Sequence, residues 1–295
     1  MITINNLTKK FSNGVVAVDH LNIDIPKGVN GLVGENGAGK STLFRLISGV
    51  YLPEEGQVAI DGHPSFSKEA KQSLFFLSDD PLYNRLDDPM GLYRFYSHFY
   101  DIDKENYQRI LKALRLPVEN KLGTYSKGMR RQTFIALSLS MDVQYLLLDE
   151  AFDGLDPLVL ETIKDEIAKK GQTTTIVIST HNIALLDKLA DRFIILYRGK
   201  LANNEETKNA DKAENLVKYQ LYFKEPLEQK AFEKVGIDVI SFRKVGSIIH
   251  LVTNENPDVE DRIKSIGKPI IMETIPLEQE ETIKLLMRSA REGDK

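Results

Sequence analysis

The feature that most constrains this chain is a glycine-rich stretch, Gly34–Thr42, which matches the pattern G-x-x-x-x-G-K-[ST]. A short apolar segment, Asn30–Val33, precedes it, and apolar residues recur at helical spacing after it. A strand, a glycine turn and a helix are the context in which this pattern binds phosphate, because glycines let backbone N–H groups close around the oxygens. A chance glycine-rich turn is the alternative. The order of elements favours an α/β fold organised around a phosphate-binding loop.

Two side chains of this loop carry chemistry. Lys40 is expected to reach the β- and γ-phosphates of a nucleotide, and the Ser41 hydroxyl is expected to hold Mg²⁺. The N-terminus of the following helix adds a partial positive charge, which favours an anion at the same place. The loop therefore predicts a nucleotide site that uses Mg²⁺.

Composition limits the remaining classes. The 295 residues are enough for one large domain and a smaller one. A net charge of -4 gives no overall attraction to nucleic acid or to an anionic membrane, and the absence of cysteine excludes disulfides and thiolate metal sites. No apolar run approaches the ~20 residues that span a bilayer. Because residues 1–7 read as an alternating strand and not as a signal peptide, the chain is expected to be cytoplasmic, with other chains supplying any membrane span.

A buried strand predicted at Tyr145–Leu148 ends in two carboxylates, Asp149 and Glu150. Four apolar residues followed by Asp-Glu form the expected partner of a phosphate-binding loop. The aspartate would bind Mg²⁺ through water, and the glutamate would polarise the attacking water. The alternative is an ordinary strand end with acidic turn residues.

Two further strands are expected to end at the same site. The apolar run Leu74–Leu77 leads to Asp79, and the β-branched run Thr174–Ser179 leads to His181. Ligands of open α/β sheets bind outside the carboxyl ends of the strands, so a carboxylate there fits a nucleotide site. A histidine at a strand end is often only a polar cap, but membership of the same sheet favours a contact with the γ-phosphate.

Helical periodicity extends from Asp88 to Leu116, inside a helical subdomain predicted at about 82–140. Apolar and aromatic residues recur there at i, i+3 and i+4 spacing, which indicates the core of that subdomain. A groove for a partner is the alternative. The residues of this stripe are Leu92, Phe95, Tyr96, Phe99 and Tyr100.

Two more segments are suited to contact a nucleotide. Ser126 is a good N-cap and Gly128 permits close backbone approach, so a helix that starts there is suited to face an anion. Phe11 precedes a hairpin turn at Asn13-Gly14. Its ring either packs against the turn or stacks on an adenine base, and both readings stay open.

The order of these motifs resembles that of an ABC transporter ATPase subunit. The resemblance covers residues 1–205 and implies an ABC ATPase core of the P-loop NTPase fold that binds ATP and Mg²⁺. It rests on five motifs in sequence: the phosphate-binding loop, Tyr125–Met129, Asp149-Glu150, the turn at Asp156, and His181.

The resemblance implies catalytic roles for Lys40, for Glu150 as general base, and for His181 as the switch histidine. The residues that it implies in binding phosphate are Gly34, Asn36, Gly37, Ala38, Gly39, Lys40, Ser41 and Thr42. Those that it implies in holding Mg²⁺ are Ser41, Asp79 and Asp149.

Four other matches concern the adenine base of the nucleotide and the dimer of ATPase subunits. In the family, an aromatic at the place of Phe11 stacks on adenine. The motif that contains Ser126 and Gly128 reaches the γ-phosphate bound by the other subunit of a head-to-tail dimer. Asp156 matches an aspartate that crosses the same interface.

The chain departs from the family pattern at several positions. The family signature is usually Leu-Ser-Gly-Gly-Gln, but Lys127 replaces its first glycine and Met129 its glutamine. Asp79 stands where the lid glutamine is expected; a carboxylate still holds the metal through water. The Tyr-Ser-Lys-Gly-Met form resembles bacterial exporter ATPases of the antibiotic- and bacteriocin-resistance type.

The tail beyond the core reads as a separate domain. A polar linker at 203–209 divides a domain at 1–205 from a small α+β domain at 210–295. The predicted order βαββαβ with an added helix suggests a ferredoxin-like sandwich. Its role is either to stabilise a dimer or to hold a regulatory ligand or partner.

Together these features predict the ATP-hydrolysing subunit of a bacterial ABC exporter, peripheral on the inner face of the membrane. The expected partners are a second ATPase subunit, like or unlike, and separate transmembrane permease subunits; no nucleic acid is expected. The alternatives are a soluble ABC ATPase acting on ribosomes or DNA, and a nucleotide-gated regulator without hydrolysis. One cassette without a heptad insertion argues against the first, and the presence of Glu150 and His181 argues against the second.

Overall fold

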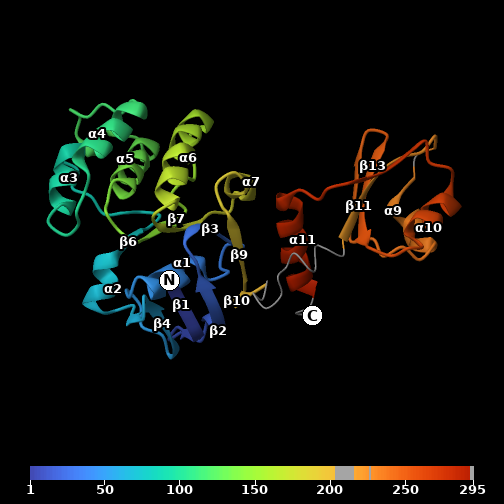
Figure 1. The fold of residues 1–295 in the computed structure, drawn as a ribbon, viewed down its shortest axis with the longest axis horizontal. Helices are drawn as coiled ribbons and strands as arrows, with labels where there is room; N and C mark the ends of the chain where they lie inside the picture. Colours follow the sequence, from blue (N-terminus) through green and yellow to red (C-terminus); the bar gives the residue numbers. More distant parts are fainter. Residues whose placement is uncertain (203–215, 226, 293–295) are drawn as a thin grey trace. The chain divides into compact units, whose positions relative to one another are not determined.

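A computed structural model of the chain describes residues 1–202, 216–225 and 227–292 (Figure 1). The chain divides into two compact units, Met1–Leu201 and Ala202–Lys295, each with its own hydrophobic core. The predicted linker at 203–209, and with it the ends of the predicted domains at 205 and 210, lie outside the described residues.

A six-stranded sheet forms the centre of the first unit, in the order β10-β9-β3-β8-β7-β6. All neighbouring pairs are parallel except β10 with β9. The central strands read as continuous apolar runs because both faces of the sheet are covered. The strands are β3 (Gly28–Val33), β6 (Leu74–Leu77), β7 (Tyr145–Asp149), β8 (Thr175–Ser179), β9 (Arg192–Tyr197) and β10 (Lys200–Leu201).

A second, antiparallel sheet has the order β2-β1-β4-β5. Helix α1 (Lys40–Ile47) packs between the two sheets, and its Phe44 shares one core with Ile2 of the antiparallel sheet and Leu147 of the parallel sheet. The phosphate-binding loop therefore leads directly into the most buried helix of the unit. The strands of this sheet are β1 (Ile2–Lys10), β2 (Val16–Ile25), β4 (Glu55–Ile60) and β5 (His63–Pro64).

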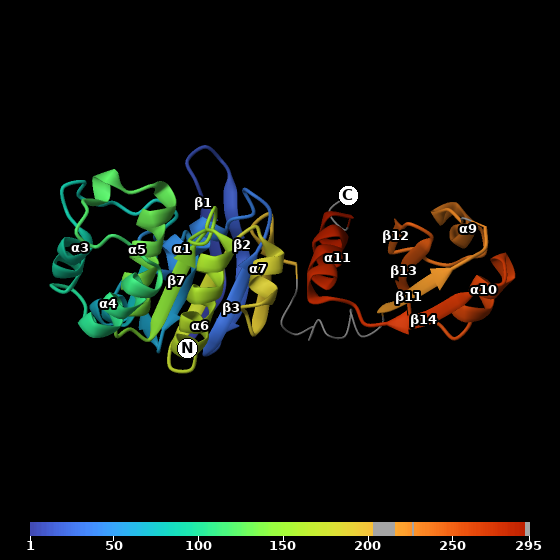
Figure 2. The same cartoon turned by 90° about the horizontal axis from the view of Figure 1, so that it is seen from above.

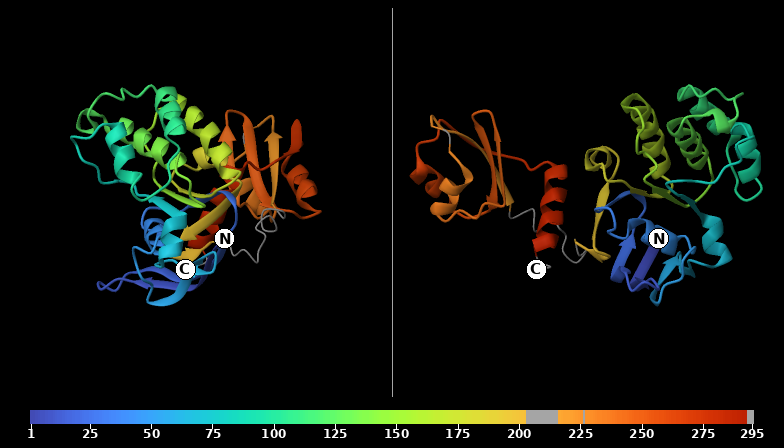
Figure 3. Two further views of the ribbon diagram at one scale, coloured as in Figure 1. Left: turned by 60° about the vertical axis from the view of Figure 1, so that its left-hand side comes forward. Right: turned by 180° about the vertical axis from the view of Figure 1, so that it is seen from behind.

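Helices cover the remaining surfaces of the parallel sheet. Helices α5 and α6 lie on the face opposite to α1 (Figures 1 and 3). Helices α3 and α4 extend the unit beyond α5 as the helical subdomain. The helices are α2 (Lys68–Ser73), α3 (Pro89–Tyr96), α4 (Lys104–Ala113), the short 3₁₀ helix η1 (Leu122–Thr124), α5 (Lys127–Leu139), α6 (Pro157–Gly171) and α7 (Ile183–Asp187).

The interpretation of the aromatic stripe as core is wrong for two of its residues. Leu92 is buried, but the side chains of Phe95 and Phe99 are 57% and 66% exposed. Helix α3 ends at Tyr96, so the helical period that would have turned Phe99 inward stops before that residue. Phe95 lies beside the buried face of α3 and its ring packs edge-on against Phe99.

The second unit contains a four-stranded antiparallel sheet in the order β12-β13-β11-β14 (Figure 2). Helices α9 and α10 supply Phe232 and Ile263 to its core. This element and strand order fits the ferredoxin-like arrangement. The elements are β11 (Leu216–Tyr222), α9 (Gln229–Lys234), β12 (Ser241–Val245), β13 (Ile248–Asn254), α10 (Val259–Ile266), β14 (Ile271–Ile275) and α11 (Gln279–Glu292). None of the helices in the described ranges is long and apolar enough to cross a membrane.

Phe44 offers a test of the core between the two sheets. Its side chain is fully buried, and its ring meets Phe76 edge-on with centroids 5.9 Å apart. Because Phe44→Ala leaves a cavity there, we expect the first unit to lose about 3–5 kcal/mol of unfolding free energy in urea denaturation. Phe66, which is exposed, is the control: Phe66→Ala is expected to change stability by less than about 0.5 kcal/mol. Equal stability of the two variants would show that Phe44 is not a core residue.

Candidate functional site

The candidate site lies at the carboxyl edge of the parallel sheet. Strand β3 leads into the phosphate-binding loop, β7 ends at Asp149, and β8 leads to His181. Because β3, β8 and β7 are parallel neighbours, these residues meet at one edge. A cavity of about 610 Å³ lies there, lined by Val15, Ala17, Glu35, Asn36, Gly37, Gly39, Lys40, Ser41, Thr42, Asp79, Arg131, Glu150, Asp153 and His181.

Two glycines are needed by the path of the loop itself. Gly39 has a φ of 105°, and a Cβ there would lie 2.2 Å from the carbonyl oxygen of Ala17. A Cβ on Gly34 would lie 2.5 Å from the carbonyl oxygen of Leu196. Only glycine fits these positions, and no side chain caps the N-terminus of α1 that follows. The free N–H groups of that helix start are therefore available to an anion.

The Lys40 side chain is buried and turned back onto its own loop. Its Nζ donates to the carbonyl oxygens of Gly34 at 2.7 Å and Glu35 at 3.3 Å, and lies 3.7 Å from Oε1 of Glu150. The ammonium group is thus held between the loop and the carboxylate at the end of β7. It occupies the region in which the sequence predicts nucleotide phosphates.

Asp149 is fully buried at the end of β7. Its Oδ1 accepts a hydrogen bond from the Ser179 hydroxyl, whereas its Oδ2 has no hydrogen-bond partner in the described part of the chain. A buried carboxylate oxygen without a partner is costly, and hydrated Mg²⁺ is the kind of group that satisfies it. Ser41 and the exposed Asp79 both line the cavity and carry oxygen ligands of the kind that Mg²⁺ prefers. The residues present therefore fit a magnesium site.

Glu150 follows directly in a left-handed backbone conformation, with a φ of 48°. Its N–H donates to both the carbonyl and the hydroxyl oxygen of Ser179, at 3.0 and 3.1 Å. Burial raises the pKa of the Glu150 carboxyl, the neighbouring Asp153 raises it further, and Lys40 and His181 oppose this change. A carboxylate whose pKa lies above its usual range is better suited to accept a proton near neutral pH.

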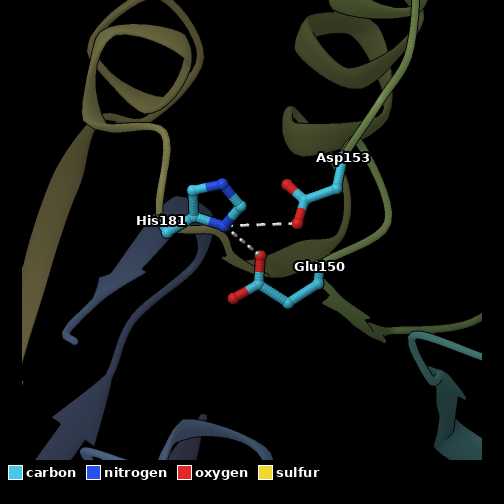
Figure 4. A group of neighbouring side chains, drawn as sticks. All are labelled: Glu150, Asp153 and His181. Carbon is cyan, nitrogen blue, oxygen red and sulfur yellow. Dashed lines mark hydrogen bonds and ion pairs between the residues drawn. The ribbon is translucent and has the colours of Figure 1, made fainter. Parts of the chain in front are cut away.

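His181 and Glu150 meet a third residue, Asp153, that was absent from the sequence-based prediction. The Nδ1 atom of His181 lies 3.3 Å from Oε2 of Glu150 and 3.2 Å from Oδ2 of Asp153 (Figure 4). Asp153 follows Glu150 by one turn, and its N–H donates to the Glu150 carbonyl at 3.3 Å. That short spacing was the available signal for its presence at the site.

Arg131 is a second residue that sequence reasoning missed. Its Nη1 donates to the carbonyl oxygen of Asp153, and its Nη2 donates to the carbonyl oxygen of Asp79 at 3.1 Å. The guanidinium therefore joins the segment after β6 to the segment after β7 beside the cavity. No local pattern in the sequence pointed to it, because it belongs to α5 and reaches the site only through packing.

Several of the predicted nucleotide- and metal-binding residues do not line the cavity. Gly34 and Ala38 belong to the loop but lie behind its lining, as does Asp149. The Phe11 ring packs edge-on against Tyr51, with centroids 5.9 Å apart. Ser126 caps α5 by accepting from the N–H of Met129 at 3.1 Å, and Asp156 caps α6 by accepting from the N–H of Leu158 at 2.9 Å.

Gly128 lies in the first turn of α5 without an evident need for glycine. A Cβ placed there would have its nearest neighbours at 3.9 Å, which is ordinary contact. Its φ is not positive, in contrast to that of Gly39. The packing within this chain therefore does not explain the glycine, and Gly128 presents open backbone at a helix start.

Comparisons with known proteins agree with this geometry. The family described as ABC transporter matches residues 18–153. The lantibiotic transport ATP-binding protein SrtF of Streptococcus pyogenes is 29% identical and covers 76% of this chain and 98% of its own length. The bacitracin transport ATP-binding protein BcrA of Bacillus licheniformis is 32% identical over 68% of each chain. Among solved structures, the ATP-binding cassette MJ0796, dimeric and bound to ADP and Pi, gives a TM-score of 0.59 at 23% identity, covering 70% of this chain and 98% of that one.

Replacing Glu150 by glutamine tests its role at the site. The amide keeps the shape of the side chain but cannot accept a proton, so we expect ATP binding to persist and turnover to fall by about 10²- to 10⁴-fold. Binding is measured by calorimetry and turnover by phosphate release. Glu161→Gln, at an exposed position on α6, is the control and should leave both unchanged. Near-normal turnover of the Glu150 variant would remove this residue from the mechanism.

Proposed function

The chain belongs to the ATP-binding subunits of the ABC transporter family, and we propose that it powers a bacterial exporter by binding and hydrolysing ATP. The observation that carries this proposal is the meeting of Lys40, Glu150 and His181 at one cavity on the carboxyl edge of the sheet. Relatives that carry transport of a lantibiotic and of bacitracin in their names support a peptide-antibiotic class of cargo. Selection of the cargo would belong to separate membrane subunits.

The loop and α1 would hold the phosphates of ATP through backbone N–H groups and the Lys40 ammonium. Lys40 would exchange its present bonds to Gly34 and Glu35 for phosphate oxygens. Ser41, Asp79 and Asp149 would hold Mg²⁺, which supplies neutralisation of phosphate charge when bound. Glu150 would accept a proton from the attacking water, and His181 would contact the γ-phosphate.

We further propose that two subunits associate head to tail around the nucleotide. Ser126 and Gly128 do not line the cavity of their own chain, and the packing around Gly128 does not require glycine. The N-terminus of α5 carries a partial positive charge that favours an anion, and the γ-phosphate held by a second subunit is the anion proposed. Asp156 would face the same interface. The association of like or unlike subunits is equally compatible with this arrangement.

Gly128→Asp tests the dimer interface. An acidic residue in the first turn of a helix is favourable, so the melting temperature of the subunit should be maintained. The new carboxylate would repel the γ-phosphate of the opposite subunit, so ATP-driven dimerisation of the Glu150→Gln subunit, followed by light scattering, should be lost. Gly123→Ala gives the contrasting control, because its Cβ would lie 2.8 Å from the carbonyl oxygen of Arg85 and should lower the melting temperature. Normal dimerisation of Gly128→Asp would contradict this interface.

The surface after β6 is the proposed contact with the permease, which would keep the subunit at the inner face of the membrane. The segment from Leu82 to Phe99 carries four exposed apolar side chains, of which Phe95 and Phe99 pack against each other, and exposed large apolar side chains mark candidate interaction sites. Asp79, just before this segment, lines the nucleotide cavity. The exposed side chains are Leu82, Leu86, Phe95 and Phe99.

Leu86→Asp separates docking from folding. The Leu86 side chain is 76% exposed, so a carboxylate there should leave the melting temperature and basal ATP turnover unchanged. At a permease interface it would be buried without a partner, so co-purification of a multi-span membrane protein in mild detergent should be abolished. Ile270→Asp, at an exposed site in the second unit, is the matched control and should preserve co-purification. Retention of the permease by Leu86→Asp would exclude this surface.

A further inference from the structure

The cluster of Glu150, Asp153 and His181 has the spacing of a metal site. One ring nitrogen and two carboxylate oxygens lie within 4.8 Å of one another. Nδ1 of His181 is 3.3 Å from the glutamate oxygen and 3.2 Å from the aspartate oxygen. In a tetrahedral zinc site with bonds of about 2.0–2.1 Å, neighbouring ligand atoms are about 3.3 Å apart. The histidine nitrogen is thus already placed relative to each carboxylate as in such a site.

Neighbouring residues hold the carboxylate of Asp153 and the backbone of Glu150. The second oxygen of Asp153, Oδ1, accepts from the Thr180 hydroxyl at 3.2 Å, and the Asp153 carbonyl accepts from Arg131. The backbone of Glu150 is anchored to Ser179. Hydrogen bonds to the outer atoms of metal ligands fix their orientation and strengthen binding. The geometry is therefore supported by neighbouring residues and does not depend on the three side chains alone.

The charge around the cluster favours a dication. Four acidic side chains line the cavity: Glu35, Asp79, Glu150 and Asp153. Two cations also line the cavity: Lys40 donates to its own loop and lies 3.7 Å from Oε1 of Glu150, and Arg131 donates to the carbonyl oxygens of Asp79 and Asp153. The acidic side chains therefore outnumber the cations of the lining by two. An imidazole nitrogen with two carboxylate oxygens is a ligand set for zinc, whereas Mg²⁺ demands an octahedron of oxygens. The cluster is thus distinct in chemistry from the magnesium site proposed at Ser41 and Asp149.

We propose that Glu150, Asp153 and His181 bind Zn²⁺ in the nucleotide-free subunit, with water as the fourth ligand, and that the ion suppresses ATP hydrolysis. Suppression follows because a carboxylate bound to zinc no longer accepts a proton from water. This second part rests on the proposed role of Glu150 as base. The first part rests only on the geometry of the cluster and on Asp153, which no motif of the sequence had singled out.

The binding test uses the intact subunit without nucleotide or Mg²⁺. Co²⁺ is the spectroscopic probe, because its tetrahedral complexes absorb intensely in the visible range and its octahedral complexes weakly. We expect wild type to give the intense spectrum, Zn²⁺ to displace Co²⁺, and calorimetry to give one zinc ion per subunit. Asp153→Ser and His181→Ala should each weaken zinc binding by more than about tenfold, since loss even of a supporting contact costs about 10- to 100-fold. Melting temperatures establish that each variant is folded.

His20 supplies a matched control. It also lies beside two carboxylates, but its Nδ1 faces Asp19 at 2.6 Å and its Nε2 faces Glu55 at 3.7 Å. Opposite ring nitrogens cannot bind one ion, so His20→Ala should leave zinc affinity unchanged. A weak octahedral spectrum for wild type, or undiminished zinc binding by folded Asp153→Ser, would overturn the proposed site.

Suppression of hydrolysis is tested by loading the nucleotide-free wild-type subunit with Zn²⁺ and then starting turnover with Mg-ATP. We expect turnover of wild type to fall at the zinc concentrations that fill the site. In Asp153→Ser, turnover is expressed relative to that of the same variant without zinc, and it should fall only at higher zinc concentrations. Turnover that is unaffected while the site is filled would overturn suppression. Failure of the proposed function gives a different result, namely normal turnover of Glu150→Gln, and leaves the nucleotide-free binding data unaffected.

Discussion

The pairing of β7 with β8 at their carboxyl ends is the contact on which the site depends. One hydroxyl, that of Ser179, donates to Asp149 and accepts from the N–H of Glu150. The other oxygen of Asp149 has no hydrogen-bond partner among the described residues, and Glu150 is held in a left-handed conformation beside Lys40. Two consecutive carboxylates thereby receive different environments, one buried behind the cavity and one facing into it. Without this pairing, an Asp-Glu pair at a strand end would be two acidic turn residues.

The parallel sheet explains why so many distant segments reach one cavity. Its strands place the residues that follow them at the same edge, and α1 is locked beneath that edge by the core that it shares with both sheets. Backbone carbonyls then connect the segments that the strands deliver. Arg131 joins the carbonyl oxygens of Asp79 and Asp153, so the segment after β6 and the segment after β7 are held by one side chain. Movement of the segment that carries the proposed permease contact would therefore be transmitted through Arg131 to the segment that contains Glu150.

Some residues serve both the fold of this chain and its proposed assembly. Ser126 and Asp156 are N-caps of α5 and α6, which explains their presence from local structure alone. The packing around Gly128 gives no such explanation. The caps are accounted for by the helices that they begin, whereas a glycine whose Cβ would meet only ordinary contacts is accounted for by a partner that approaches its backbone. Gly128 is therefore the residue of this group that most directly supports the proposed head-to-tail dimer.

The sequence by itself determined the features that depend on local pattern. The loop at Gly34–Thr42, the strand that ends at Asp149, and the element order of the second unit were all readable, because strand, turn and helix signals act over a few residues. Outward-facing Phe95 and Phe99 were misread as core, since periodicity indicates a face but not what covers it. Asp153 and Arg131 were found only in the tertiary structure. Their importance comes from contacts to residues brought close by packing, and a carbonyl or a ring nitrogen delivered by another element leaves no mark on the local sequence.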